Sequence, residues 1–254
     1  MLELSQKIEH VLATKGLKPQ SYYAWLEEYG ETSLVEQVLI AQGMPLIKHN
    51  GRFLFRTSIT PIEDETFCIV DIETNGSNPQ NDQIIEIGAI KLKNGKIIDT
   101  FSSLIYADRI SDTISEVTGI TLDMLKSAPK LKPVMYKFKE FLAQHIFVAH
   151  DVRFDYGFIS ETIDKLGLEP IKNRRLCTID LAERTFVSKR YGLGYLNETL
   201  KLNPDASHHR ALDDAQTTIN LLKKLLLERD TTLETTEDLI RFSKSAPKAT
   251  HSKK

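Results

Sequence analysis

The eight residues Phe67-Cys68-Ile69-Val70-Asp71-Ile72-Glu73-Thr74 predict a buried strand that ends in a functional site. The first four are apolar and include three residue types that favour strands, which is typical of a strand covered on both faces. Side chains alternate along a strand, so Asp71 and Glu73 share one side while Ile72 points into the core. Gathering two carboxylates at one point costs free energy unless a cation lies near them.

The segments that follow this strand indicate an α/β fold. Residues 84–90 and 97–105 are strand-like runs with a turn signal between them, which predicts an antiparallel three-stranded meander. Residues 146–149 and 175–178 predict a fourth and a fifth strand, with helical segments between and after them. We therefore expect a mixed five-stranded sheet that is flanked by helices.

Two more acidic clusters lie where a loop becomes a helix. Asp155 falls in the first turn of the helix after the fourth strand, where the helix dipole favours a carboxylate. His209 and Asp214 are five residues apart across the start of a helix expected at 211–228. Successive helical residues point about 100° apart, so we expect Asp214 to face the strands and Asp213 to face outward. Each cluster taken alone is an ordinary helix-end or loop feature.

Together and in order, the three clusters resemble the motifs of the DEDDh family of 3′–5′ exonucleases. The matching segments are Asp71-Ile72-Glu73-Thr74 for the first motif, His150 through Phe154-Asp155 for the second, and His209-x-Ala211-x-x-Asp214 for the third. The histidine of the third motif marks the DEDDh branch. The resemblance spans about residues 66–228 and is strongest to the proofreading epsilon subunit of bacterial DNA polymerase III and its free-standing relatives.

The resemblance implies a two-metal hydrolase built on a ribonuclease H-like sheet. Two Mg²⁺ or Mn²⁺ ions would be held by four carboxylates, those of Asp71, Glu73, Asp155 and Asp214. Oxygen ligands suit these hard cations better than they suit Zn²⁺. His209 would act as the general base, because an imidazole can accept a proton near neutral pH.

The resemblance also implies which residues contact the substrate. The predicted substrate-binding residues are Thr74, Asn75 and Gly76 in the turn after the metal strand, and Thr118 and Gly119 in a loop near the terminal base. Asp151 is a departure, because the family usually has asparagine at this position beside the bound nucleotide. Aspartate is a good helix N-cap, so Asp151 either caps the next helix or adds negative charge to the substrate site.

Residues 1–60 predict a separate, small, winged-helix-like accessory domain with three helices and a hairpin. The hairpin turn is Asn50-Gly51, a strong turn signal, and Ser33 with Glu36 predicts a capping box for the third helix. Six basic and six acidic residues give this segment no net charge, so it lacks the basic footprint of a nucleic-acid reader.

The remaining boundaries follow from composition. Residues 61–65 predict a linker because they are acidic and begin with a proline. Residues 66–228 are expected to form the exonuclease domain. Residues 229–254 predict a short helix, capped near Thr235, and then a disordered basic tail.

Bulk composition favours a cytoplasmic protein with no membrane partner, and the family resemblance implies that it is a bacterial enzyme. The formal net charge is −2 and hydrophobic residues make up 41% of the chain. Its apolar runs are shorter than the roughly 20 residues of a membrane span, and the N-terminus does not resemble a secretory signal. Cys68 and Cys177 lie in apolar segments and are expected to be buried, reduced thiols.

These features predict a metal-dependent exonuclease that releases nucleoside monophosphates from the 3′ end of DNA, single-stranded or frayed, in proofreading or repair. DNA polymerase III subunits are candidate partners. An RNA 3′-end trimming enzyme of the same fold is an open alternative, because the motifs do not distinguish DNA from RNA. A polymerase-associated binding module without activity is disfavoured, because all four carboxylates and the histidine are present.

Overall fold

The computed structural model describes residues 5–204 and 209–246 of the chain. Its central strand is β3 (Thr66–Thr74), the middle of a five-stranded sheet of order β5-β4-β3-β6-β7. β4 and β5 pair antiparallel on one side of β3, while β6 and β7 pair parallel on the other. Their bounds are Ile84–Lys93 (β4), Lys96–Leu104 (β5), Ile146–Ala149 (β6) and Arg175–Cys177 (β7). The predicted mixed, ribonuclease H-like sheet is confirmed.

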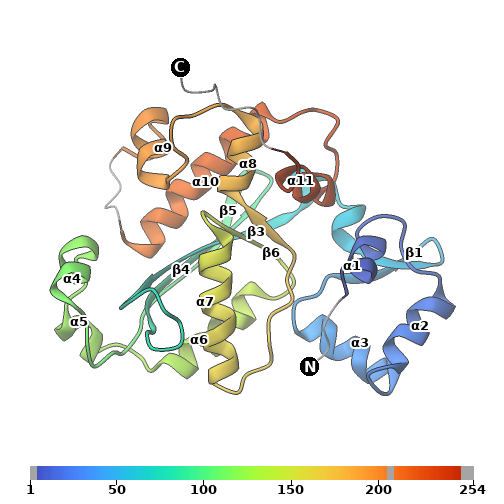
Figure 1. Cartoon of the computed structure of the whole chain (residues 1–254), viewed down its shortest axis with the longest axis horizontal. Helices are drawn as coiled ribbons and strands as arrows, with labels where there is room; N and C mark the ends of the chain where they lie inside the picture. Colours follow the sequence, from blue (N-terminus) through green and yellow to red (C-terminus); the bar gives the residue numbers. More distant parts are fainter. Residues whose placement is uncertain (1–4, 205–208, 247–254) are drawn as a thin grey trace.

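Helices cover both faces of the sheet, as the alternation of side chains along β3 requires (Figure 1). Cys68, Val70 and Ile72 belong to the apolar core formed with α6 and α7. Phe67 and Ile69 belong to a second core formed with α8, α9, α10 and α11. The two acidic residues of β3 therefore point to the second face. The helix bounds are α6 (Leu131–Leu142), α7 (Val152–Lys165), α8 (Thr178–Thr185), α9 (Leu193–Leu200), α10 (Ala211–Glu228) and α11 (Thr236–Ser243).

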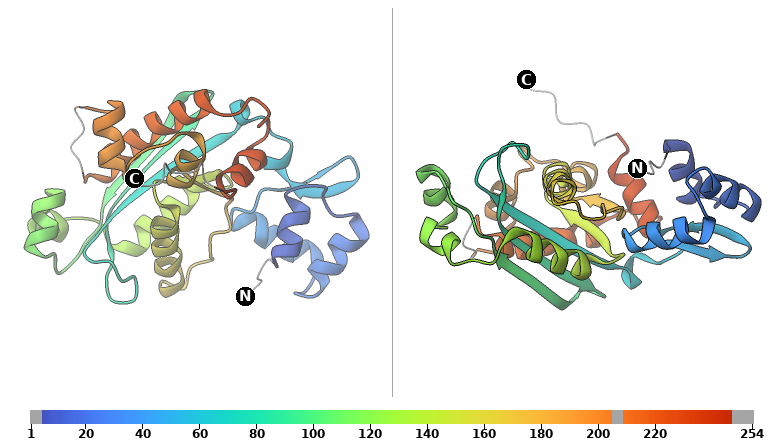
Figure 2. Two further views of the ribbon diagram at one scale, coloured as in Figure 1. Left: turned by 45° about the horizontal axis from the view of Figure 1, so that its top comes forward. Right: turned by 90° about the horizontal axis from the view of Figure 1, so that it is seen from below.

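The N-terminal residues form a module at one end of the molecule, opposite α4 and α5 (Figure 2). Three short helices precede a two-stranded hairpin, which is the predicted order of elements. The rings of Tyr22 and Phe53 stack in its core with centroids 3.8 Å apart. Asn50 and Gly51 both have positive φ, 46° and 74°, as a tight hairpin turn requires. The bounds are α1 (Gln6–Leu12), α2 (Pro19–Glu27), α3 (Thr32–Ala41), β1 (Leu46–His49) and β2 (Arg52–Phe55), with α4 (Asp112–Thr118) and α5 (Leu122–Lys126) at the far end.

The predicted capping box at Ser33 is wrong, because Glu31 caps α3 instead. The Glu31 carboxylate accepts hydrogen bonds from the backbone N–H groups of Ser33 and Leu34, at 3.0 and 2.8 Å. Glu36 accepts a hydrogen bond from the Tyr22 hydroxyl at 2.8 Å and so joins α3 to α2. The helix therefore begins two residues earlier than a cap at Ser33 would place it, and Glu31 satisfies the free backbone donors of its first turn.

The segment expected to be a linker is ordered and partly buried. Ile62 and Glu65 are both buried around the short 3₁₀ turn η2 (Ile62–Asp64), and Glu65 accepts from Arg56 at 2.8 Å. The polar composition of this segment does not reveal its burial. Glu65 can be buried because it pairs with Arg56 of the preceding 3₁₀ turn, η1 (Arg56–Ser58).

The segment after residue 228 contains a helix that packs into the core. The predicted cap near Thr235 is confirmed, because Thr235 and Asp238 form a reciprocal capping box at the start of α11. Leu239 and Ile240 of α11 are fully buried in the core shared with α8 and α10. The basic tail expected at 247–254 lies outside the described residues.

Two further expectations concern the cysteines and the absence of a membrane-spanning helix. Cys68 and Cys177 are both buried and neither forms a disulfide, as predicted. Within residues 5–204 and 209–246, no helix is both long and apolar enough to cross a membrane.

Candidate active site

The acidic end of β3 meets the start of α10 because a glycine lets the helix approach the sheet. Asp71 of β3 pairs in register with Gly88 of β4. A Cβ atom at Gly88 would lie only 2.6 Å from the backbone carbonyl carbon of Ala211 and from the backbone nitrogen of Leu212. The first turn of α10 therefore rests directly on β4, which brings Asp214 to the strand that carries Asp71.

This contact gathers the residues of the third motif around the first. Glu73, His209 and Asp214 each offer a ligand atom, and these atoms lie within 4.8 Å of one another. The backbone N–H of His209 donates to Asp214 Oδ2 at 3.2 Å. As expected, Asp214 is buried against the sheet, while the neighbouring Asp213 is more exposed. The arrangement presents two carboxylates and an imidazole to one small space.

A buried glutamate of β4 fixes the turn that carries His209. Glu86 lies opposite Glu73 in the strand register, and its carboxylate accepts from the Arg210 guanidinium at 2.7 Å. The same carboxylate accepts from the backbone N–H of Ala211 at 3.0 Å. The sequence analysis assigned no role to Glu86. The sequence does contain a signal for such a role, because Glu86 is a charged residue within an apolar run that predicts a buried strand.

Asp155 completes the set of four carboxylates from the opposite face of the sheet. It lies in the first turn of α7, is 4% exposed, and its Oδ1 accepts from the backbone N–H of Ile72 at 3.2 Å. Asp151 occupies the N-cap position with a left-handed φ of 77°. Its carboxylate makes no capping bond to the described backbone and lies 3.9 Å from the Arg153 guanidinium, so the predicted capping role is wrong.

His150 of the second motif has a structural role, because both of its ring nitrogens form hydrogen bonds within the protein. Its ring nitrogens lie 2.9 Å from the Thr178 hydroxyl and 2.8 Å from the Tyr191 carbonyl oxygen, which ties the β6–α7 turn to α8. Burial lowers the pKa of His150 to about 4. A neutral imidazole is therefore expected, with Nε2 donating to the carbonyl.

The surroundings of Asp71, Glu73 and Asp155 oppose the ionisation of these three carboxylates. Burial, with the charges of Asp155, Asp214 and Glu73, raises the pKa of Asp71 well above its usual range. Burial, with Asp214 and Glu86, raises the pKa of Glu73 to about 7. The pKa of Asp155 is raised as well, mainly by burial. Groups arranged in this way would be stabilised in their charged form by a bound cation.

A groove of about 270 Å³ opens directly beside Glu73 and is called the terminal groove here. Its other lining residues are Thr74, Gly76, Ser77, Thr113, Ile114, Val117, Thr118 and Phe154. Val117 and Phe154 are 50% and 40% exposed, so they give the terminal groove an apolar lining that faces solvent. Aromatic side chains in such positions can stack on nucleic-acid bases. The sequence analysis placed Phe154 in the second motif but did not predict this contact.

The predicted substrate-contact residues divide into two groups. Thr74, Gly76 and Thr118 line the terminal groove. The backbone N–H of Asn75 donates to the Gln83 carbonyl at 3.1 Å and its side-chain oxygen accepts from the Gln83 N–H at 2.8 Å, so its groups shape the loop. Gly119 ends α4 in a left-handed conformation with φ of 69°, a role that suits glycine.

Comparison with known proteins identifies the family. Residues 68–222, more than half of the chain, match the sequence profile of the exonuclease family RNase_T. The chain belongs to the RNase_T exonuclease family. The matched segment begins in β3 and ends in α10, so it contains every element that carries the four carboxylates and His209. The family resemblance predicted from the motifs is confirmed.

The curated relatives of this RNase_T-family chain are much longer than it is. The DNA polymerase III PolC-type protein of Thermotoga petrophila is 35% identical over 222 residues, which are 84% of this chain and 16% of that protein. The Bacillus cereus PolC-type protein is 37% identical over 194 residues, 76% of this chain and 13% of that protein. The chain therefore spans about one-sixth or less of these relatives.

Solved structures agree on the fold. A structure titled Exonuclease X in complex with 5′ overhanging duplex DNA matches with a TM-score of 0.55 and 28% identity. The match covers 70% of this chain and 99% of that one. Escherichia coli Exonuclease I in complex with a dT13 oligonucleotide matches with a TM-score of 0.58 at 16% identity, covering 65% of this chain and 42% of that one.

The donor set of this RNase_T-family site fits divalent cations. Asp71, Glu73, Asp155 and Asp214 supply carboxylate oxygens, the ligands that Mg²⁺ and Mn²⁺ prefer. Four carboxylates gathered at one point, three of them with raised pKa values, are a costly arrangement for a protein without bound cations. Two divalent ions would balance that charge, which is the physical argument for a metal site at this position.

Proposed function

We propose that this chain is a metal-dependent 3′–5′ exonuclease that releases nucleoside monophosphates from the 3′ end of DNA in a bacterial cytoplasm. The observation that carries the proposal is the convergence of Asp71, Glu73, Asp155 and Asp214 with His209 beside the terminal groove. The groove gives the terminal nucleotide a place next to the carboxylates. Single-stranded or frayed ends are the proposed substrate, because their terminal base is free to enter the groove.

The four carboxylates would hold two Mg²⁺ or Mn²⁺ ions, which supply an activated water and stabilise the leaving oxygen when bound. Asp71 would be one of the residues that hold the ions, since it lies close enough to Asp155, Asp214 and Glu73 for their charges to raise its pKa. His209 would accept the proton of the attacking water, since its ring lies with Glu73 and Asp214 around one space. Glu86 and Arg210 hold the turn that positions this ring. We expect His209→Ala to lower kcat about 10²- to 10⁴-fold, the scale of a lost general base.

The terminal groove would bind the last nucleotide before cleavage. The exposed faces of Phe154 and Val117 would contact the base, while Thr74 and Gly76 lie where the sugar would follow. Asp151 lies close enough to Asp155 to raise that residue's pKa, so its charge adds to the carboxylate site rather than to a base contact. We propose that Asp151 slightly weakens the grip on the nucleotide compared with asparagine.

Relatives support DNA rather than RNA as the substrate, and a role in proofreading or repair. The PolC-type relatives are DNA polymerases, and the two solved structures are titled as exonucleases in complex with DNA. We infer that DNA polymerase III subunits are candidate partners on the same ground. We also propose that residues 1–60 form an accessory domain and that 66–228 form the exonuclease domain.

The proposal is tested with one 20-nucleotide single strand made as DNA and as RNA, labelled at either end, with Mg²⁺ or Mn²⁺. We expect 5′-labelled DNA to shorten one nucleotide at a time, and 3′-labelled DNA to release labelled mononucleotide at once. Asp214→Ala should abolish cleavage, while the matched neighbour variant Asp213→Ala should retain it. Internal cuts, shortening from the 5′ end, faster cleavage of RNA, or full activity in Asp214→Ala would contradict the proposal.

A further inference from the structure

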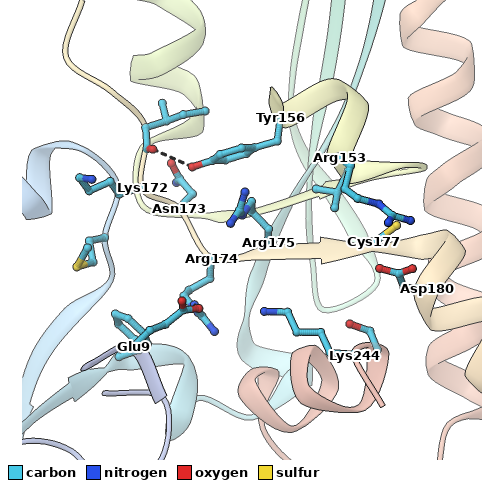
Figure 3. Close-up of a pocket in the computed structure, with 15 residues that line it drawn as sticks. Glu9, Arg153, Tyr156, Lys172, Asn173, Arg174, Arg175, Cys177, Asp180 and Lys244 are labelled. Atoms are coloured by element: carbon cyan, nitrogen blue, oxygen red, sulfur yellow. Dashed lines mark hydrogen bonds and ion pairs between the residues drawn. The ribbon is translucent and has the colours of Figure 1, made fainter. Parts of the chain in front are cut away.

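A second cavity of about 530 Å³ lies between the N-terminal module, β7 and α11 (Figure 3). We call it the basic cleft. Among its described lining residues, five are basic and two are acidic, although the whole chain has a net charge of −2. The charged lining residues are Glu9, Arg153, Lys172, Arg174, Arg175, Asp180 and Lys244.

Each of the two acidic residues of the basic cleft lies beside an arginine. Glu9 pairs with Arg174, whose guanidinium also binds Glu237 at 2.6 and 2.9 Å. Asp180 lies 3.8 Å from the guanidinium of Arg184, on the same helix. Among the described residues, Arg175 and Lys244 form no ion pair within 4.0 Å, although the charges of both lower the pKa of Glu9. These two side chains are therefore the ones that a ligand can pair with.

Three basic side chains of the cleft are solvent-exposed and come from separate elements. Arg153 lies on α7, Arg175 on β7, and Lys244 directly after α11. Figure 3 shows the Arg175 guanidinium beside Tyr156 on one side of β7 and the Lys244 side chain on the other side of this edge strand, so the cleft extends around the edge of the sheet. The Arg175 guanidinium rests 4.4 Å from the centre of the Tyr156 ring, which holds it in place over the cleft. Held cations from several elements suit a chain of phosphates better than a single small anion.

The first turn of α7 separates the basic cleft from the terminal groove. Arg153 and Tyr156 line the basic cleft, and Phe154 lines the terminal groove. Asp155, between them in sequence, is the proposed metal ligand. One helical turn therefore contacts all three places, and the N-terminal end of α7 is the shortest route from the groove to the cleft.

We propose that the basic cleft binds the backbone phosphates of a single-stranded nucleic acid whose 3′ nucleotide occupies the terminal groove. This inference rests on the proposed function. A helix with its side chains is about 10–12 Å across, and stacked nucleotides rise about 3.4 Å each, so roughly three to four nucleotides separate the two places. Substrates of three nucleotides or fewer cannot reach the cleft, while longer single strands fill both.

The test compares Arg175→Gln/Lys244→Gln with the control Lys96→Gln/Lys137→Gln, whose exposed lysines lie on β5 and α6 outside the cleft. Both pairs remove two positive charges. Steady-state cleavage of a trinucleotide and of a 20-nucleotide single strand is measured for each. Binding of the fluorescent 20-mer is measured by anisotropy in EDTA at several salt concentrations.

The cleft variant should raise KM for the 20-mer roughly 10- to 30-fold at 0.1 M salt and leave the trinucleotide unaffected. Its plot of log binding constant against log salt should flatten by about 1.4, the value for two lost phosphate contacts. An equal effect on both substrates, or no effect on the 20-mer, would overturn the inference. If the wild-type protein cleaves neither substrate, the proposed function fails, and the anisotropy series still decides whether the cleft binds the strand.

Discussion

At the scale of single residues, the carboxylate of Glu73 shows the main property of the site. It is half-buried beside Asp214 and Glu86, and its pKa is raised to about 7 from an ordinary value of 4.5. The folded protein therefore binds a proton there at pH values where the unfolded chain has released it. Without metal, folding stability should fall as pH rises across that window, because the unfolded state then binds fewer protons than the folded state.

This predicts a pH-dependent effect of Glu73→Gln on the metal-free protein. In EDTA, the variant should gain unfolding free energy relative to the wild type between pH 4.5 and 7, and the gain should level off above pH 7. Urea unfolding at pH 5, 6, 7 and 8 measures it, with the exposed Glu116→Gln as the control. A difference between wild type and Glu73→Gln that stays constant with pH would contradict the assigned environment of Glu73.

The residues of the candidate site could be proposed from the sequence, but the contacts that hold them in position could not. Asp71, Glu73, Asp155 and Asp214 are recognisable because their residue types and order match a family pattern. The bond from Arg210 to Glu86 joins positions 124 residues apart, and only the fold shows that they meet. For Asp151 the sequence left two roles open, a cap of α7 or an added negative charge. The left-handed backbone and the missing capping bond, which exclude the first role, cannot be read from the residue type.

At the scale of elements, the contact of α10 on β4 decides whether the site forms. Gly88→Ala would place a methyl group 2.6 Å from backbone atoms of Ala211 and Leu212, and backbone cannot move aside as a flexible side chain can. We expect a loss of about 1–3 kcal/mol of unfolding free energy, typical of overpacking, and a larger proportional loss of activity. Chemical unfolding and cleavage of the 20-mer measure the two effects.

Gly157→Ala is the matched control for this prediction. Gly157 is a glycine of α7 with no heavy atom within 4 Å of an added Cβ, so alanine should be tolerated or slightly stabilising there. Normal activity and stability in Gly88→Ala would show that α10 does not depend on this close approach.

Element positions were more predictable than element ends. The hairpin at Asn50-Gly51 and the cap at Thr235 follow from local chemistry, and both were confirmed. The second helix begins at Pro19, because proline is well tolerated in a first helical turn. The cap of α3 was missed because a glutamate is a less common N-cap than serine.

At the scale of the whole molecule, Arg174 joins the N-terminal module to the catalytic sheet. Its guanidinium binds Glu9 of α1 and Glu237 of α11, and the Glu237 side chain is 1% exposed. Thr57 donates to the same Glu237 carboxylate at 2.8 Å. The segment expected to be a linker is therefore adjacent to a buried polar junction, which composition alone could not indicate.

Arg174→Ala should destabilise the protein by about 3–5 kcal/mol, because it leaves the buried Glu237 charge without its main partner. The control is Arg241→Ala, which removes an exposed pair with Asp238 and should cost about 1 kcal/mol or less. Unfolding monitored by Trp25 fluorescence in the N-terminal module and by circular dichroism should give coincident transitions in the wild type. Equal losses in the two variants would contradict a structural role for the junction.

The central claim is that the four carboxylates form a two-metal site, and crystals soaked in Mn²⁺ with thymidine 5′-monophosphate test it most directly. Anomalous diffraction should show two peaks about 3.5–4 Å apart, with Asp71, Glu73, Asp155 and Asp214 around them. The nucleotide base should lie against Phe154 in the terminal groove. Absence of anomalous signal at Asp71, or peaks only elsewhere on the protein, would contradict the account.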